Sequence, residues 1–143
     1  MTALLVDSSV IFKWFHEDGE SEVAEARAIR DANQRGTVDA CIIDLALYEV
    51  GNILLVRLRW NAEDIADQLH DLITICGTPF VTTPAWLRDA AALAAANRLT
   101  FYDAAWAATA RGLGITLVSA DAALLAAGLA QSPAAAARQL RLR

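Results

Sequence analysis

Two acidic residues of this sequence follow short apolar runs, a position where carboxylates often do chemistry. Asp7 comes directly after Ala3–Val6, and Asp121 comes shortly after Ile115–Val118. Both runs are predicted to be buried strands of a parallel sheet. Ligand sites in such sheets lie beyond the carboxyl ends of the strands, so the two carboxylates are expected at the same edge.

Each of these aspartates has hydroxyl side chains within two residues. Ser8 and Ser9 follow Asp7, and Ser119 precedes Asp121. Such hydroxyls can cap the following helix, and they can also orient a carboxylate or a metal-bound water. An aspartate between a strand and a helix is most often only a helix cap, so neither position identifies a site by itself.

Two further acidic residues lie within predicted helices. Asp103 stands near the start of an otherwise apolar helix over Phe101–Arg111, where an unpaired carboxylate would be costly unless the helix dipole eased that cost. Glu49 lies in the middle of a predicted helix over Leu45–Leu58, and Asn52 projects from the same helical face. A buried Glu–Asn pair without a ligand is the alternative interpretation.

Four carboxylates gathered in one place would repel each other strongly. A like-charged pair ~4 Å apart costs about 4 kcal/mol at an effective dielectric constant of 20. Either several of them remain protonated or a cation lies among them. Oxygen ligands without His or Cys favour Mg²⁺ or Mn²⁺ over zinc. Such a site suits the activation of water for in-line attack on a phosphodiester.

The remaining pattern predicts the elements that position these residues. Short apolar runs, expected to be strands, alternate with helical segments without a linker or repeat, which indicates a single α/β domain over residues 1–143 with helices on both faces of a parallel sheet. The strands are expected at Ala3–Val6, Ala40–Ile43, Phe80–Thr82 and Ile115–Val118. Helices capped by Asp44, Asn61 and Ser132 are expected among the helical segments.

Composition excludes several classes of protein. The chain is 56% hydrophobic and 20% charged, with a net charge of −5, so it is neither disordered nor basic enough to grip nucleic acid over its whole surface. No apolar run is longer than seven residues, which predicts no membrane span. The first residues lack a signal-peptide pattern, and a cytoplasmic location is expected. The spacing of Cys41 and Cys76 and of His16 and His70 fits no zinc site.

The acidic residues also lie in four ordered segments that resemble the motifs of PIN domains. These segments are Leu4–Ser9, Glu49–Asn52, Leu99–Ala105 and Leu117–Asp121. In length and motif spacing the chain is similar to the VapC toxins of bacterial VapBC toxin–antitoxin systems. The resemblance implies a three-layer, flavodoxin-like α/β/α fold with strand order 3-2-1-4-5. It also implies Mg²⁺- or Mn²⁺-dependent endoribonuclease activity on structured RNA such as tRNA or rRNA, homodimerisation, and inhibition by a VapB antitoxin.

The same resemblance assigns roles to individual residues. Asp7, Asp103 and Asp121 would hold the principal metal, and Glu49 with Asp103 could hold a second. Three residues match the supporting polar positions of the motifs: Ser9, Asn52 and Ser119. All four acidic positions are filled, so the sequence favours an active enzyme.

Other classes of protein fit the sequence less well. A signalling receiver domain shares the acidic pocket but needs a lysine late in the chain, and Lys13 is the only lysine. A DxDxT phosphatase would need an aspartate where Ser9 stands. A catalytically silent PIN-like scaffold for protein binding is the main alternative.

Basic and apolar residues suggest further contacts. Lys13 could reach a phosphate near the metal, while two pairs of arginines, Arg27 with Arg30 and Arg57 with Arg59, are either solvated or RNA-binding. Trp106 is expected in the core or at a dimer interface. The unbroken apolar run Ile53–Val56 predicts burial on a second side, by a dimer partner or an antitoxin.

Overall fold

A short parallel sheet forms the centre of the computed structural model, which describes residues 1–142. The central strand β1 (Thr2–Val6) pairs with β2 (Val38–Cys41) on one side and with β3 (Thr116–Val118) on the other. Single parallel bridges extend the sheet on both sides, from Ile43 to Phe80 and from Val118 to Gln131. The predicted order 3-2-1-4-5 is therefore present, with each outermost strand reduced to one bridging residue.

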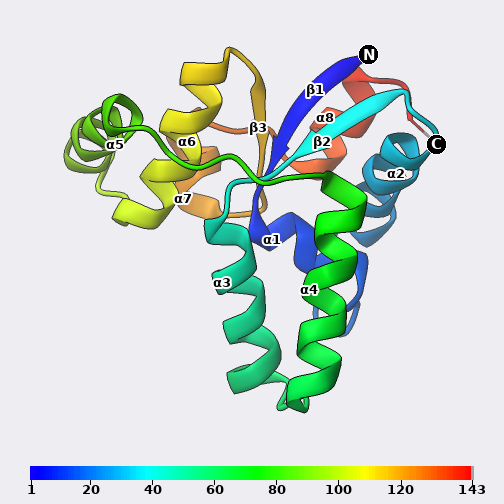
Figure 1. Ribbon diagram of the computed structural model, residues 1–143. Helices are drawn as coiled ribbons and strands as arrows, with labels where there is room; N and C mark the ends of the chain where they lie inside the picture. The colour runs from blue at the N-terminus through cyan, green and yellow to red at the C-terminus, as the bar shows by residue number, and fades with distance from the viewer. Residues whose placement is uncertain (143) are drawn as a thin grey trace.

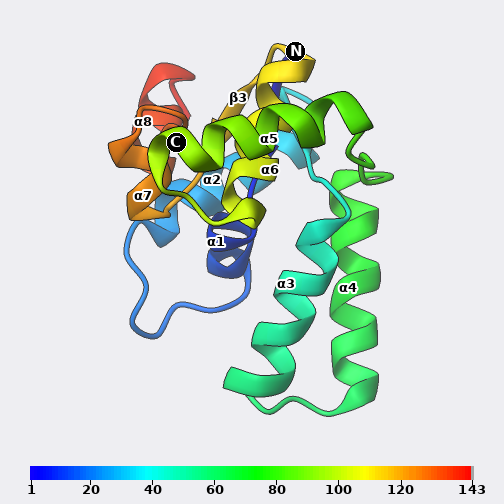
Figure 2. The same cartoon turned by 90° about the vertical axis from the view of Figure 1, so that its left-hand side faces the viewer.

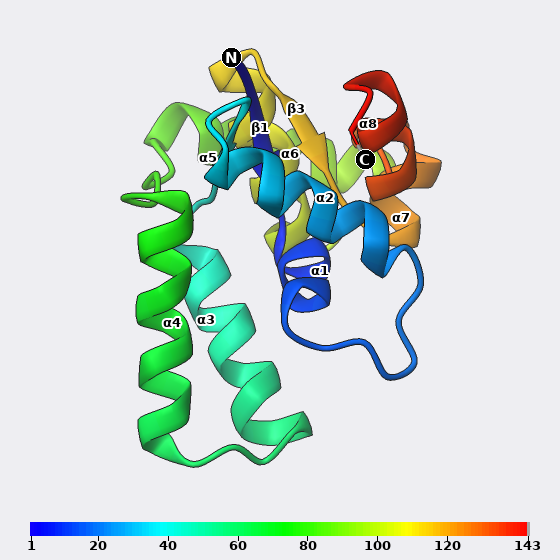
Figure 3. The ribbon, with the colours of Figure 1, turned by 90° about the vertical axis from the view of Figure 1, so that its right-hand side faces the viewer.

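Helices cover both faces of the sheet, which confirms the predicted three-layer α/β/α class. On one face lie α2 (Val23–Gln34) and α8 (Pro133–Gln139), and on the other lies α6 (Phe101–Leu113) with α5 (Pro84–Asn97) packed against it (Figure 1). Turning the molecule to either side shows α5 and α6 in front in Figure 2 and α2 in front in Figure 3.

The carboxyl ends of the strands lead into the elements that carry the acidic residues. β1 runs into α1 (Ser8–Ile11) and the 3-10 turn η1 (Phe12–Trp14), and β3 leads to α7 (Ala122–Ala126). β2 leads to α3 (Leu45–Asn52), which continues as the π-helical turn η2 (Ile53–Arg57) and returns as α4 (Ala62–Cys76). Figure 1 shows α3 and α4 side by side, projecting beyond this end of the sheet.

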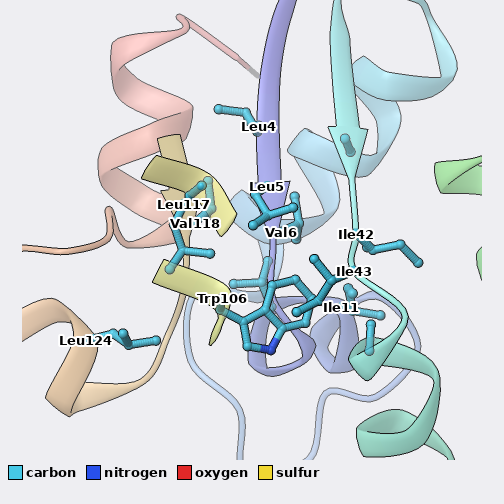
Figure 4. Packing of buried hydrophobic residues seen from close by; sticks show 14 of the residues in the cluster. Leu4, Leu5, Val6, Ile11, Ile42, Ile43, Trp106, Leu117, Val118 and Leu124 are labelled. Atoms are coloured by element: carbon cyan, nitrogen blue, oxygen red, sulfur yellow. The ribbon is translucent and has the colours of Figure 1, made fainter. Parts of the chain in front are cut away.

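The core lies between the sheet and its helical layers. Leu5 and Val6 of β1 are fully buried, and so is Ile43, while Trp106 of α6 is 1% exposed. Figure 4 shows the Trp106 indole lying against these residues below the end of β1. The alanines of α6 keep the helix close to the sheet because their side chains are small. This close packing brings the start of α6, with Asp103, to the carboxyl end of β1.

Two predicted details are wrong. Asp44 stands at the N-cap position of α3, but its backbone is already helical and its side chain makes no capping hydrogen bond; its N–H donates to the carbonyl of Phe80 at 3.0 Å. The predicted strand Phe80–Thr82 is only the bridge at Phe80, and Thr83 already caps α5 three residues later. Among residues 1–142 no helix is long and apolar enough to cross a membrane.

Candidate active site

A cleft of about 350 Å³ opens at the carboxyl ends of β1 and β3. All four acidic residues singled out from the sequence line it, and they come from four different elements or turns. The full lining is Asp7, Ser8, Ser9, Glu49, Asn52, Ile53, Asp103, Trp106 and Asp121. Of the predicted supporting residues, Ser9 and Asn52 line the cleft, while Ser119 is fully buried beside Ser9.

Asp7 is the most deeply buried of the four carboxylates. It caps α1: its Oδ1 accepts hydrogen bonds from the Ser9 hydroxyl at 2.6 Å and from the backbone amides of Ser9 and Val10. Burial raises the pKa of Asp7 to about 6, against the opposing effect of the Ser119 and Ser9 hydroxyls, and the negative charge of Glu49 raises it further. A cap alone would leave the carboxylate in solvent, so this burial sets Asp7 apart from an ordinary cap.

Ser9 and Ser119 connect the turn of Asp7 to the turn of Asp121. The Ser9 hydroxyl accepts a hydrogen bond from the amide of Ala120 at 2.9 Å, and it lies 3.5 Å from the Ser119 hydroxyl. The Ser119 hydroxyl in turn accepts from the amide of Asp121 at 3.0 Å. Asp121 uses Oδ2 to cap α7 through the amide of Leu124. The two strand-end carboxylates are thereby held in one rigid polar unit.

Asp103 faces the cleft from the first turn of α6, which Thr100 caps. Desolvation raises the pKa of its carboxyl, and the neighbouring charges of Asp121 and Glu49 raise it further. The like charges of Asp121 and Glu49 thus act on Asp103 across the cleft.

Glu49 is held by two donors that the sequence did not single out for this role. The Ser8 hydroxyl donates to its Oε1 at 2.7 Å, and the Trp106 indole N–H donates to the same oxygen at 2.9 Å. Trp106 lies three residues after Asp103, on the same helix. That spacing, together with the need of a buried indole N–H for an acceptor, is the signal that could have identified it.

The donor set of the cleft fits a hard divalent cation. Its ligating groups are carboxylates, hydroxyls and one amide, and no Lys, Arg or His is among the described residues that line it. Within residues 1–142, no three acidic, histidine or cysteine side chains are already gathered tightly enough to hold a metal ion. The cleft thus supplies oxygen ligands of the type that such a cation prefers.

Several basic residues have structural partners instead of facing the cleft. Lys13 is 4% exposed, and its ammonium group donates to Glu20 at 3.0 Å and to the carbonyl of Ser21 at 2.7 Å. The suggestion that Lys13 reaches a phosphate is therefore wrong. Arg27 and Arg30 donate to the carbonyls of Lys13 and Trp14, so they tie α2 to η1.

Comparison with known proteins agrees with the α/β/α fold. The family model of the PIN domain matches residues 4–128. The chain is 34% identical to "Ribonuclease VapC3" of Pyrobaculum aerophilum over 122 residues, which covers 82% of this chain and 88% of that protein.

Two solved structures share the whole architecture. PAE2754 from Pyrobaculum aerophilum matches with a TM-score of 0.67 and 26% identity, covering 98% of this chain and 97% of that one. FitAcB from Neisseria gonorrhoeae matches with a TM-score of 0.62 over 91% of this chain and 97% of that one; at 19% identity it supports the fold alone. The fold and cleft define a three-layer α/β/α protein with an acidic site at the strand ends. The chain belongs to the PIN-domain family.

Proposed function

We propose that the protein is a Mg²⁺- or Mn²⁺-dependent endoribonuclease. The observation that supports this proposal most directly is the placement of Asp7, Glu49, Asp103 and Asp121 around one cleft, with no basic side chain among the described residues that line it. The relative "Ribonuclease VapC3" supports the choice of RNA as substrate. A divalent cation bound there would activate water for in-line attack and stabilise the leaving oxygen.

Different residues of the cleft would act as ligands of that cation or as supports of those ligands. Asp7, Asp103 and Asp121 are the proposed principal ligands, and Glu49 with Asp103 would hold a second ion. Asp7 and Asp121 each use one carboxylate oxygen as a helix cap, so the other oxygen remains for the metal. Ser9 and Ser119 hold the turn of Asp7 against the turn of Asp121. Asn52 adds a side-chain amide to the lining of the cleft.

The experiment is cleavage of RNA by the purified protein, freed of any bound partner. We expect cleavage with Mg²⁺ or Mn²⁺, 5′-phosphate product ends, and loss of activity in EDTA. Asp103→Asn should lower the rate at least 100-fold, since it removes a charged ligand while keeping the shape of the side chain. Asp39→Asn is the matched control, because Asp39 is exposed on β2 at the opposite end of the sheet.

Three results would contradict parts of the nuclease proposal. Cleavage that persists in EDTA would exclude the metal, and an active Asp103→Asn variant would exclude this cleft. If the wild type binds a protein partner but cleaves no RNA under any metal condition, the catalytically silent scaffold is the better description.

Sequencing of RNA ends after expression in cells would identify the target, which we propose is a structured RNA such as tRNA or rRNA in the cytoplasm.

We further propose that the nuclease is a toxin held inactive by a VapB-type antitoxin. The exposed apolar residues near the end of α3 support this, since Leu55 is 58% exposed and Val56 is 64% exposed beside the cleft residue Ile53. A partner segment with apolar side chains would cover them and pass over the cleft. Expression alone should be toxic, and co-expression of a small protein encoded beside the gene should relieve it.

A second copy of the chain is the proposed partner for another apolar surface. Tyr48, Val81, Phe101 and Tyr102 are 73%, 70%, 46% and 62% exposed, and three of them border a 240 Å³ hollow between α3 and α6. Light scattering should give the mass of a dimer for the wild type. Tyr102→Glu should give a monomer, because it places a charge in that surface, whereas a monomeric wild type would contradict the proposal.

A further inference from the structure

Trp106 uses its only polar atom on a carboxylate of the cleft. The indole is 1% exposed within the core, yet its Nε1–H donates to Glu49 Oε1 at 2.9 Å. Trp14 offers a direct comparison in the same chain: it is also buried, and its indole N–H donates at the same distance to the backbone carbonyl of Ala26. A backbone carbonyl would satisfy a buried indole equally well, so the choice of Glu49 as acceptor has a consequence for the site.

Both donors to Glu49 act on the same oxygen. The Ser8 hydroxyl reaches Oε1 at 2.7 Å, and no donor among residues 1–142 reaches the other oxygen, Oε2. A free glutamate side chain samples many rotamers, and fixing it costs conformational entropy when a ligand binds. Two donors on one oxygen fix the carboxylate before any ligand arrives, and they leave Oε2 available to the cleft.

The contact also links the elements that carry the acidic residues. Ser8 follows Asp7 on α1, Glu49 lies on α3, and Trp106 lies one helical turn beyond Asp103 on α6. Any shift of α6 relative to α3 would therefore move Asp103 and the Trp106 donor together. The hydrogen bonds to Glu49 Oε1 thus connect α3 to α1, which Asp7 caps, and to α6, which carries Asp103.

We propose that Trp106, assisted by Ser8, is a positioning residue that directs Glu49 Oε2 toward a divalent cation in the cleft. The inference rests on the proposed nuclease site. It goes beyond that proposal by giving a residue of the hydrophobic core a role in metal affinity. Loss of an outer hydrogen bond to a metal ligand typically weakens metal binding about 10- to 100-fold.

The first experiment measures Mn²⁺ binding by calorimetry, without RNA, in matched tryptophan variants. Trp106→Phe keeps the aromatic ring but removes the N–H, and it should weaken Mn²⁺ binding about 10-fold. Ser8→Ala should weaken it in the same direction. Trp14→Phe loses an equally short buried bond at a residue outside the cleft lining, so it should leave Mn²⁺ affinity unchanged even where it lowers the melting temperature. A Trp106→Phe variant that binds Mn²⁺ like the wild type, while Glu49→Gln binds it poorly, would overturn the inference.

The second experiment uses the wild-type protein and so does not depend on the folding of a variant. In a ¹H–¹⁵N NMR spectrum, the indole resonance of Trp106 should move as Mg²⁺ is added, because the charge on its acceptor becomes shared with the ion. The resonance of Trp14 should stay in place. A stationary Trp106 resonance at saturating Mg²⁺ would overturn the positioning role, with the metal site intact. Absence of any Mg²⁺ or Mn²⁺ binding by the wild type would overturn the proposed metal site, and the inference with it.

Discussion

The hydroxyl of Ser9 lies 2.6 Å from Oδ1 of Asp7 and donates a hydrogen bond to it. The same hydroxyl accepts from the amide of Ala120, so one side chain joins the turn after β1 to the turn after β3. Ser9→Ala removes both bonds and should lower the free energy of unfolding by about 1–2 kcal/mol. RNA cleavage should fall as well, because Asp7 and Asp121 lose their common support.

The control for Ser9 is a serine whose hydroxyl also accepts a backbone hydrogen bond but lies outside the cleft. Ser132 caps α8 through the amide of Ala135 at 3.1 Å, away from the cleft lining. Ser132→Ala should lower stability by about 1 kcal/mol and leave cleavage unchanged. Urea unfolding and RNA cleavage should be measured on both variants. Equal cleavage by the two variants would show that the hydrogen bonds of Ser9 contribute only to stability.

The buried carboxyl of Asp7 should make the metal-free protein less stable as the pH rises. Its pKa of about 6 in the folded protein exceeds the ordinary value of 3.8, so the folded state binds more protons than the unfolded state between these values. The free energy of unfolding should therefore fall between about pH 4 and pH 6. For a shift of this size the loss amounts to about 3 kcal/mol.

Asp7→Asn isolates this effect from all other titrating groups. Asparagine is also a good helix cap, and it carries no charge to desolvate. In EDTA the variant should be more stable than the wild type at pH 7.5, and the two should converge near pH 4. Urea titrations at several pH values give the difference directly. Added Mg²⁺ should stabilise the wild type and not the variant, whereas a difference independent of pH would rule out ionisation as the cause.

Much of the site could be predicted because its residues occupy positions fixed by local rules. A carboxylate directly after a buried strand must lie at the carboxyl edge of a parallel sheet, which placed Asp7 and Asp121 correctly. Glu49 and Asp103 required the ordered motifs of the family, because a carboxylate inside a helix can face in any direction. Their place in the same cleft depends on how closely α6 packs on the sheet.

The features that escaped prediction depend on contacts between distant segments. Trp106 and Ser8 meet at Glu49 over separations of 57 and 41 residues. The Lys13 ammonium group binds Glu20 and the carbonyl of Ser21 instead of facing the cleft. These two partners lie in a loop whose path no sequence pattern specifies. Asp44 has the residue type and position of a helix cap, yet its backbone, which pairs with Phe80, is helical and its side chain makes no capping bond. Tertiary contacts override local preference at each of these positions.

The Lys13–Glu20 pair should stabilise the loop before α2 without contributing to metal binding. Lys13 is buried and Glu20 is 18% exposed, so removing one partner leaves the other poorly solvated. Lys13→Met keeps the length of the apolar stem and should lower the free energy of unfolding by about 1–3 kcal/mol. Mn²⁺ affinity should not change. A weakened Mn²⁺ affinity in Lys13→Met would return this lysine to the functional site.

Two helical glycines should respond in opposite ways to the same substitution. A Cβ added at Gly112 on α6 would collide with the Trp86 indole of α5, approaching its Cδ1 to 2.6 Å and its Cε2 to 2.8 Å. A Cβ added at Gly51 on α3 would meet only Leu69 Cδ1, at an ordinary 3.6 Å. Alanine is favoured over glycine in a helix by about 1 kcal/mol, so only the surroundings separate the two positions.

Gly51→Ala should therefore raise the free energy of unfolding by up to about 1 kcal/mol, while Gly112→Ala should lower it by about 1–2 kcal/mol. A double-mutant cycle with Trp86→Ala identifies the cause. Once the indole is gone, Gly112→Ala should become stabilising, because the helix preference remains and the collision does not. Urea unfolding of the four proteins gives the coupling. If Gly112→Ala remained destabilising in the Trp86→Ala background, a contact other than the indole would be the cause.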